Sequence, residues 1–209
     1  MNHKTYTIMP GINAGMLTLE DLERLTDIVR RYEVPATKIT GAQRFAFLGL
    51  APERLEALKE ELHLPERPPH TRNQVHYVQA CPGSRWCKYG KGDALSLGEA
   101  IGRLRLQGPL PYKVKVGVSG CRMCCCESWM RDVGLTMESK GWRLTFGGNA
   151  AGTPRIGDVV ATGLNDQQAV DLVEKTLNFY IEKAKYKTRS ARFMERFGIE
   201  TLRKGVLEE

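Results

Sequence analysis

Six cysteines are the residues of this chain best suited to chemistry, and they form two groups. The first group is Cys81 and Cys87, which enclose five residues in the segment CPGSRWC. The second group lies within six residues and contains Cys121, Cys124, Cys125 and Cys126. Three consecutive cysteines are a poor framework for disulfide bonds, so the pattern favours thiolate ligation of a metal or a cluster.

The spacing of the cysteines bears on which metal centre they could hold. Structural zinc sites usually place roughly two to four residues between the ligands of each arm, so the gap between Cys81 and Cys87 fits zinc poorly. Cys121 and Cys125 enclose three residues. Ligation by thiolates alone also suits an iron–sulfur cluster. Spacing therefore favours a cluster and leaves zinc open, with Cys124 and Cys126 expected to be ordinary buried thiols.

Two lysines precede the second cysteine group on a predicted strand. Three valines alternate with Lys113, Lys115 and Gly117 in the segment KVKVGV. Because successive side chains of a strand face opposite ways, the valines can enter a core while both lysines share the other face. A lysine pair on a strand is usually a solvated surface. Beside a cysteine-rich turn, however, it also indicates a site where a metal centre meets an anion.

Composition and charge set broad limits on the protein. The chain has 209 residues, of which 42% are hydrophobic and 26% are charged, as in an ordinary globular protein with a sizeable core. The start, MNHKTYTIMPG, lacks a secretory signal, and no apolar run approaches the roughly 20 residues of a membrane span. We therefore expect a cytoplasmic protein with reduced cysteines and no membrane partner. The net charge of +7 permits nucleic acid, an anionic cofactor or substrate, or an acidic protein as partner.

The first part of the chain predicts a small α+β unit. Thr18 is a plausible N-cap, and the leucines that follow recur at helical spacing. The expected elements are a strand at 5–9, a helix at 18–32, strands at 37–40 and 44–50 joined by a tight turn at 41–42, and a helix at 52–62. This order predicts a ferredoxin-like half-domain that lacks its last strand.

A proline-rich linker, HLPERPPH at 63–70, separates that unit from a second one, so we expect domains at 1–68 and 69–209. The second domain should be of α/β type. Its expected strands are 75–79, 113–118, 134–138 and 142–146. Its expected helices are 94–106, 127–132, 165–185, 188–197 and 199–207. A glycine-rich loop at 147–155 follows the last of these strands.

The cysteine pattern resembles a known family when it is taken with its surroundings. C-x5-C followed by C-x3-C in the context VSGCRMCCCESWMRDVGL resembles the sirohaem–[4Fe–4S] domain of the sulfite and nitrite reductases. GMLTLEDLERL and TGAQRFAFLGL resemble the half-domain of that family, with Thr40 and Gln43 in its Thr-x-x-Gln element. FGGNAAGTPRIG resembles the glycine-rich loop after the cluster, and KTRSARFMERFGIETLRK the closing helix pair. The resemblance covers nearly the whole chain.

The resemblance implies two cofactors and a set of residues that hold them. The [4Fe–4S] cluster would be bound by Cys81, Cys87, Cys121 and Cys125, with Cys125 bridging the cluster to the sirohaem iron. Lys113 and Lys115 would bind an oxyanion and supply protons as its S–O or N–O bonds break. Sirohaem also carries many carboxylates, which suit arginine. The remaining cofactor-binding candidates are Thr40, Gln43, Arg44, Arg72, Arg85, Gly148, Asn149, Arg155 and Arg192.

This chain departs from the family pattern in two ways. Full-length members contain two copies of the unit and one active sirohaem, with the cysteines from one copy and the lysines from the other. A two-fold homodimer of this single-copy chain would restore that arrangement. The first strand, YTIMPGINAG, also lacks the family's active-site arginine, which counts against sulfite turnover or moves that role to another cation.

The resulting prediction is a small assimilatory-type sulfite reductase, which reduces sulfite to sulfide with six electrons. No G-x-G-x-x-G segment follows a strand, so the electrons should come from a separate ferredoxin-like or other small acidic carrier. Reduction of nitrite to ammonia is the close alternative. A non-catalytic iron–sulfur electron-transfer protein is another, which the missing arginine favours. A zinc-dependent nucleic-acid-binding module lacks the expected aromatic and basic interleaving, so no nucleic-acid partner is expected.

Overall fold

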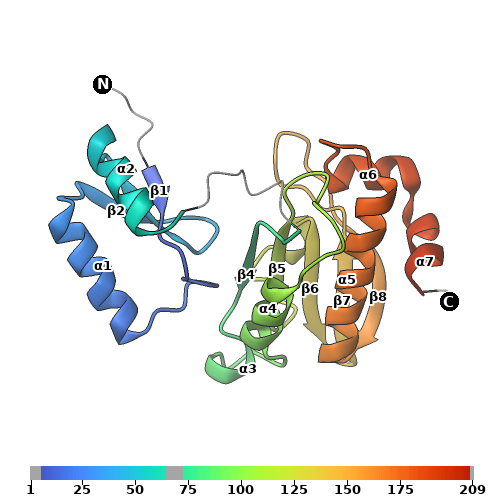
Figure 1. Ribbon diagram of the computed structural model, residues 1–209. Coiled ribbons are helices and arrows are strands. Elements are labelled where there is room, and N and C mark those ends of the chain that lie inside the picture. Colours follow the sequence, from blue (N-terminus) through green and yellow to red (C-terminus); the bar gives the residue numbers. More distant parts are fainter. Residues whose placement is uncertain (1–5, 65–72, 208–209) are drawn as a thin grey trace. The chain divides into compact units, whose positions relative to one another are not determined.

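The computed structural model describes residues 6–64 and 73–207, in two compact units that divide between Arg67 and Pro68 (Figure 1). The expected domain boundary at residue 68 lies outside the described residues and stays a prediction. Arg72, one of the cofactor-binding candidates, lies outside them as well.

The first unit contains the elements expected of a ferredoxin-like half-domain. Strands β1 (Tyr6–Ile8), β3 (Phe45–Leu48) and β2 (Ala36–Ile39) form an antiparallel sheet in that spatial order. Helix α1 (Leu19–Arg31) follows β1, and helix α2 (Pro52–Glu61) follows β3. The order strand–helix–strand–strand–helix confirms the predicted fold of this unit.

Local sequence explains where the first unit's main helix starts and which face it buries. The Thr18 hydroxyl accepts a hydrogen bond from the Asp21 N–H, and the Asp21 carboxylate accepts one from the Thr18 N–H, which completes a capping box. One turn and two turns further on, Leu25 and Ile28 are buried against Phe47 of β3 in one hydrophobic core.

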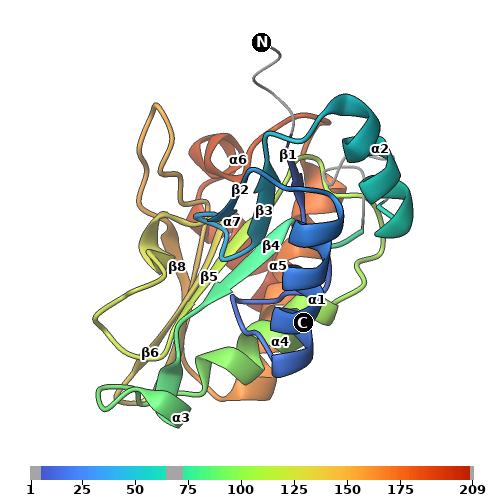
Figure 2. The same ribbon diagram turned by 90° about the vertical axis from the view of Figure 1, so that its left-hand side faces the viewer.

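The second unit is a mixed five-stranded sheet with helices (Figure 2). Its spatial order is β4 (Tyr77–Ala80), β5 (Lys115–Ser119), β6 (Val133–Glu138), β7 (Gly141–Phe146) and β8 (Asp158–Leu164). The first three strands are parallel, and β7 and β8 continue the sheet antiparallel. The helices are α3 (Gly83–Trp86), α4 (Ala94–Arg103), α5 (Asp166–Lys183), α6 (Ser190–Phe197) and α7 (Ile199–Leu207). The predicted α/β class is confirmed.

Three local expectations need correction. Strand β5 begins at Lys115 rather than Lys113, because the Lys115 N–H donates to the Asp132 carboxylate at 2.9 Å and ladder pairing with β6 starts one residue later. The predicted helix at 127–132 is only a 3-10 turn, Ser128–Met130, since Glu127 has a left-handed backbone (φ 54°) that no α-helix contains. Neither strand β8 nor the short helix α3 was expected.

The core of the second unit forms as the valine alternation predicts. Val114, Val116 and Val118 are fully buried, whereas Lys113 and Lys115 remain half-buried on the other face. Trp142 of β7 is also fully buried, and its indole N–H donates to the Asp166 carboxylate at 2.6 Å, which fixes the start of α5 against the sheet. Within the described residues, no helix combines the length and apolarity that crossing a membrane would require.

Candidate functional site

The sheet topology brings the two cysteine groups to one place. Strands β4 and β5 are adjacent and parallel, so their carboxyl ends lie at the same edge of the sheet. Cys81 follows directly after β4, and Cys121 comes two residues after β5. The two arms, residues 81–92 and 120–126, therefore start side by side although they are far apart in the sequence.

Backbone hydrogen bonds join the two arms at Gly120. The Gly120 N–H donates to the Cys81 sulfur at 3.1 Å. The Gly120 carbonyl in turn accepts from the N–H groups of Lys91 and Gly92, at 2.8 and 3.1 Å. One residue of the second arm thus contacts both ends of the first arm, which fixes their mutual position.

Glycine is required at this crossing because the backbones approach so closely. A Cβ on Gly120 would lie 2.7 Å from the Gly92 carbonyl oxygen and 2.8 Å from the Gly83 Cα. Both are backbone atoms, so nothing there can move aside cheaply. Gly83 also has a positive φ of 61°, in the region that favours glycine.

The environment of Cys81 stabilises its thiolate. A hydrogen bond from the Cys126 thiol lowers the pKa of Cys81 most, and the N–H groups of Gly120 and Gly83 add to this effect against the opposing effect of burial. The resulting pKa of about 5 leaves Cys81 ionised at neutral pH. Since the thiolate is the form that ligates metal, Cys81 is prepared for that role.

The surroundings of Cys125 destabilise its thiolate, in contrast to those of Cys81. Burial raises the pKa of Cys125, and the negative charges of Cys81, Cys121 and Cys87 raise it further. All four predicted cluster ligands therefore lie within electrostatic reach of one another. Because neighbouring thiolates repel each other, a cationic iron centre between them would relieve the repulsion, and this donor set of sulfurs fits an iron–sulfur cluster. Among the described residues, no three cysteine, histidine or acidic side chains meet in the geometry that a metal ion needs.

The two surplus cysteines differ from each other. Cys126 is only 3% exposed, as expected for a buried thiol. Its hydrogen bond to Cys81, together with burial, raises the pKa of Cys126 far above the ordinary thiol value. The expectation of burial is wrong for Cys124, which is half-buried and lies in a left-handed turn (φ 57°) beside the surface.

The segment after the cysteines folds back over strand β5. The Cys126 N–H donates to the Ser119 hydroxyl at 3.2 Å, and that hydroxyl lies 2.8 Å from the buried hydroxyl of Ser128. A Cβ on Gly117 would lie 2.7 Å from the Cys126 carbonyl oxygen. The turn at 126–131 therefore covers the middle of the β5 face that carries Lys115 at its other end.

Lys115 lies next to a buried carboxylate, Asp132, that sequence reasoning missed. Burial lowers the pKa of Lys115, and the nearby positive charge of Arg189 lowers it further. Asp132 is 1% exposed and accepts hydrogen bonds from the Lys115 N–H, from the Arg189 guanidinium at 3.0 Å and from the Ser190 hydroxyl. The sequence gives little indication of Asp132, because one acidic residue before a strand belongs to no repeating pattern.

The lysines and the cysteines lie at opposite ends of β5. Lys115 begins the strand and Ser119 ends it, just before Cys121. At a rise of about 3.3 Å per residue, the four steps of the strand separate these ends by about 13 Å. The turn at 126–131 covers the strand between Lys115 and Ser119.

The glycine-rich loop packs against the same turn. A Cβ on Gly148 would lie 2.4 Å from the Arg131 carbonyl oxygen. Asn149 pairs with Arg155 through two backbone hydrogen bonds, and its side-chain amide donates to the Thr153 carbonyl at 2.7 Å. The Arg155 guanidinium donates to the Gly147 carbonyl at 3.0 Å and forms an ion pair with Asp158 at 2.6 Å. Asn149 and Arg155 thus hold the loop closed through contacts within it.

The remaining candidates are distributed over three places. Arg85 pairs with Asp93 at 2.7 Å beside the first arm, and Arg192 makes an exposed ion pair with Glu195 on α6. Thr40, Gln43 and Arg44 belong to the first unit, where the Thr40 carbonyl accepts from the Gln43 N–H at 2.9 Å in the β2–β3 turn. Their role toward a cofactor stays a prediction.

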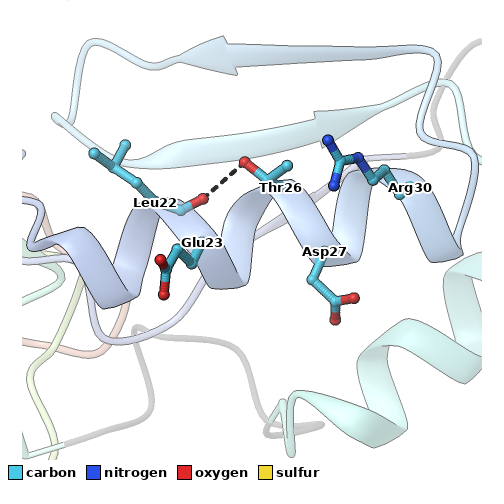
Figure 3. Close-up of a pocket in the computed structure, with 5 residues that line it drawn as sticks. All are labelled: Leu22, Glu23, Thr26, Asp27 and Arg30. Carbon is cyan, nitrogen blue, oxygen red and sulfur yellow. Dashed lines mark hydrogen bonds between the residues drawn. The ribbon is translucent and has the colours of Figure 1, made fainter.

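The first unit also has a shallow surface hollow of about 300 Å³ on helix α1 (Figure 3). Leu22, Glu23, Thr26, Asp27 and Arg30 line it, and the Thr26 hydroxyl donates to the Leu22 carbonyl at 2.9 Å. None of the predicted site residues belongs to this group. Apolar and charged side chains lie together around this hollow along one helix, and they do not form a recognisable catalytic or ligand-binding group.

Comparison with protein families accounts for both units. Residues 71–209 match the model of the nitrite and sulphite reductase 4Fe-4S domain, and residues 1–64 match that of the nitrite/sulfite reductase ferredoxin-like half domain. The chain belongs to the nitrite and sulphite reductase family. The expected family membership is thereby confirmed, and the cysteine arms lie in the iron–sulfur domain of that family.

Individual relatives include reductases for both anions. The chain is 44% identical over 203 residues to an assimilatory-type sulfite reductase of Nitratidesulfovibrio vulgaris, covering 97% of this chain and 93% of that protein. It is 32% identical over 196 residues to a nitrite reductase [NAD(P)H] of Bacillus subtilis, covering 93% of this chain but only 24% of that protein. A nitrite reductase (NADH) large subunit of Escherichia coli is likewise 32% identical, and this chain covers 25% of that protein.

Solved structures support the fold. The chain superposes on dissimilatory sulfite reductase I with a TM-score of 0.77 and 14% identity, over 98% of this chain and 69% of the other. The NirA protein of Mycobacterium tuberculosis gives a TM-score of 0.70 with 19% identity, over 94% and 38% of the two chains. The order of elements described above is therefore shared at low sequence identity.

Proposed function

We propose that this protein is a sirohaem- and [4Fe–4S]-dependent reductase that converts sulfite to sulfide with six electrons. The observation that carries the proposal is that the two arms bearing Cys81, Cys87, Cys121 and Cys125 begin at one sheet edge and are joined at Gly120. The relative that is 44% identical along nearly its whole length carries the name of that reaction.

The four thiols would hold the cluster, and Cys125 would be shared with the haem iron. Cys125 is the exposed member of the set, which leaves its sulfur accessible to a second group. The cluster and the haem, when bound, supply electron storage and a site for the reducible anion. The polypeptide supplies the thiolates, keeps them in position and controls the charge around them.

Lys113 and Lys115 are proposed to hold the anion and deliver protons to its oxygens. Each oxygen removed from sulfite must leave as water, so protons must arrive together with electrons. Burial lowers the pKa of Lys115, which makes its ammonium a better proton donor than that of an ordinary lysine. Arg189 lies close enough to Lys115 to affect its charge, and we propose that Arg189 supplies the cation that the first strand lacks.

A homodimer would combine the lysines with the cysteines. Within one second unit the two sets lie at opposite ends of β5, with the turn at 126–131 between them. A two-fold related copy could place its Lys113 and Lys115 over the anion site of its mate, and the mate would do the same in return. We propose this exchange as the reason that a single-copy chain can be active.

An anaerobic absorption spectrum with iron and acid-labile sulfide counted per chain is the experiment that tests the proposal. We expect sirohaem bands, about four cluster irons plus one haem iron for each chain, and reoxidation of a reduced dye when sulfite is added. Zinc without iron would contradict the proposal. Iron and sulfide without anion-dependent reoxidation would instead identify a non-catalytic electron-transfer protein.

Nitrite reduction to ammonia is the second candidate, and the nitrite reductase relatives at 32% identity favour it. The same dye assay with nitrite in place of sulfite compares the two anions directly. A higher kcat/KM for nitrite would assign the protein to that reaction. The electron donor in either case is proposed to be a small acidic carrier, and the six free thiols suit a reducing, cytoplasmic setting.

A further inference from the structure

Large apolar side chains lie exposed on both cysteine arms. Trp86 is 75% exposed, Tyr89 60% and Met123 73%. Trp86 directly precedes Cys87, and Met123 lies between Cys121 and Cys124. Isolated exposed apolar residues are common, but three of this size on two short joined loops mark an interaction surface.

Uncompensated positive charge surrounds these side chains. Lys88, Lys91 and Arg122 are exposed and form no ion pair within the part of the chain that the structure describes. The two arms contain no acidic residue, and the acidic residues that directly follow them are already engaged, since Asp93 pairs with Arg85 and Glu127 pairs with Arg131, both at 2.7 Å. The surface is therefore positive, and an acidic partner complements it.

A backbone hydrogen bond joins the two arms that carry this surface. The Lys91 N–H donates to the Gly120 carbonyl, which places the residues after Gly120 beside the end of the first arm. The Lys88 ammonium lies 4.9 Å from the centre of the Tyr89 ring, so cation and aromatic ring form one contact area. We call this surface the arm patch; it comprises Trp86, Lys88, Tyr89, Lys91, Arg122 and Met123.

We propose that the arm patch is the docking surface for a small acidic one-electron carrier protein. The inference rests on the proposed function, because only a redox centre at the arms needs electrons delivered there. Trp86 and Lys88 flank Cys87, and Arg122 follows Cys121, so a carrier on the patch would lie next to two proposed cluster ligands and the path to the cluster would be short. A surface that combines exposed apolar side chains with lysine and arginine also fits the small, transient interfaces of electron-transfer complexes.

The test measures how fast a carrier reduces the cluster of the full-length, cofactor-loaded protein. A photoreduced acidic two-cluster ferredoxin is mixed with the protein, and cluster bleaching is followed by stopped flow at several salt concentrations. For Lys88→Glu with Lys91→Glu, we expect the second-order rate constant to fall by about tenfold or more at low salt and its salt dependence to flatten. Trp86→Ala should slow the reaction while leaving the salt dependence unchanged.

The control variant Lys185→Glu with Lys204→Glu makes the same change in net charge elsewhere. Both lysines are exposed; Lys204 lies on α7, and Lys185 follows α5 at the end of the unit opposite the arms. The control should keep the ferredoxin rate within about twofold. Dithionite-reduced methyl viologen should reduce all variants at the wild-type rate.

Three results would overturn the docking proposal. The first is an equal loss of rate in the patch and control variants, and the second is an equal loss with ferredoxin and with the dye. The third is conversion of a wild-type dimer to a monomer by Trp86→Ala in sedimentation, which would make the patch a contact between subunits. Anion-dependent reoxidation is scored separately, so failure of the reductase and failure of the docking surface give different outcomes.

Discussion

At the scale of single residues, hydrogen bonds determine how readily the Cys81 thiol ionises. It accepts from the Gly120 N–H and from the Cys126 thiol, and the latter contributes most to its lowered pKa. Hydrogen bonds to ligand sulfurs withdraw charge and so favour the reduced form of a cluster. Cys126 is therefore expected to act on the reduction potential although it is not one of the four proposed cluster ligands.

The Cys126→Ala variant tests this role. Removing the donor should lower the midpoint potential of the cluster, whereas Cys126→Ser, which retains a hydroxyl, should lower it less. Potentiometric titration followed by electron paramagnetic resonance measures the shift, with iron and sulfide counted to exclude cluster loss. The matched control is Cys124→Ala, and a potential that moves equally in the control would remove Cys126 from this role.

Lys115 predicts a pH dependence at the same scale. Burial lowers its pKa, so the ammonium loses its proton at a lower pH than an ordinary lysine, whose pKa is about 10.4. Turnover that needs the ammonium should therefore be constant below this lowered pKa and should fall as the pH rises through it. Lys115→Arg keeps the positive charge, but a guanidinium stays protonated and does not act as a proton donor. We expect this variant to lower kcat with little change in KM and to lose the alkaline decline; an unchanged pH profile would exclude Lys115 as the proton donor.

At the scale of elements, the sequence predicted what depends on local patterns. The capped, leucine-rich helix α1 and the alternating valines of β5 were found, because their periodicity follows directly from burial of one face. Strand β8 was missed because Val160 is its only fully buried side chain, so no alternation marks it. Asp132 and Arg189 were missed because the residue before β6 meets the residue before α6 only in the folded unit, and no local sequence pattern indicates that contact.

The crossing of the two arms gives a prediction at this scale. Gly120→Ala places a methyl group 2.7–2.8 Å from backbone atoms of the first arm, so the arms must separate. We expect the purified variant to retain much less iron and sulfide per chain. Gly152→Ala is the matched control, because a Cβ there has no heavy atom within 4 Å. Equal cofactor content in the two variants would show that the close approach at Gly120 is unimportant.

The buried carboxylate of Asp132 joins three elements and predicts a stability effect. It accepts from the start of β5, precedes β6 and pairs with Arg189 and Ser190 at the start of α6. Asp132→Asn leaves the Arg189 guanidinium without its counter-charge, which should lower the free energy of unfolding by about 3–5 kcal/mol. Glu200→Ala, which removes an exposed ion pair with Arg203, should change it by at most about 1 kcal/mol. Chemical denaturation measures the free energy of unfolding of both variants. Similar losses would mean that Asp132 does not hold these three elements together.

At the scale of the whole molecule, the separation of lysines and cysteines can be tested by mixing chains. One chain carries Lys113→Ala with Lys115→Ala, and the other carries Cys81→Ser; each alone should be inactive. If lysines act across a dimer, a mixed dimer contains one complete site, and random pairing should restore about a quarter of wild-type turnover. Sites that take both sets from one chain would give no recovery, and that result would exclude the exchange between subunits.

Strand β5 also has a consequence for how such proteins can evolve. In a single-copy chain with the proposed site, the anion-binding lysines and the cluster-binding cysteines would border the two ends of one short strand, so selection would act on both ends together. A tandem duplication would release that constraint, because each copy would need to keep only one end. Mutations should then accumulate at the cysteines of one copy and at the lysines of the other, whereas a single-copy chain with the proposed site would have to preserve both.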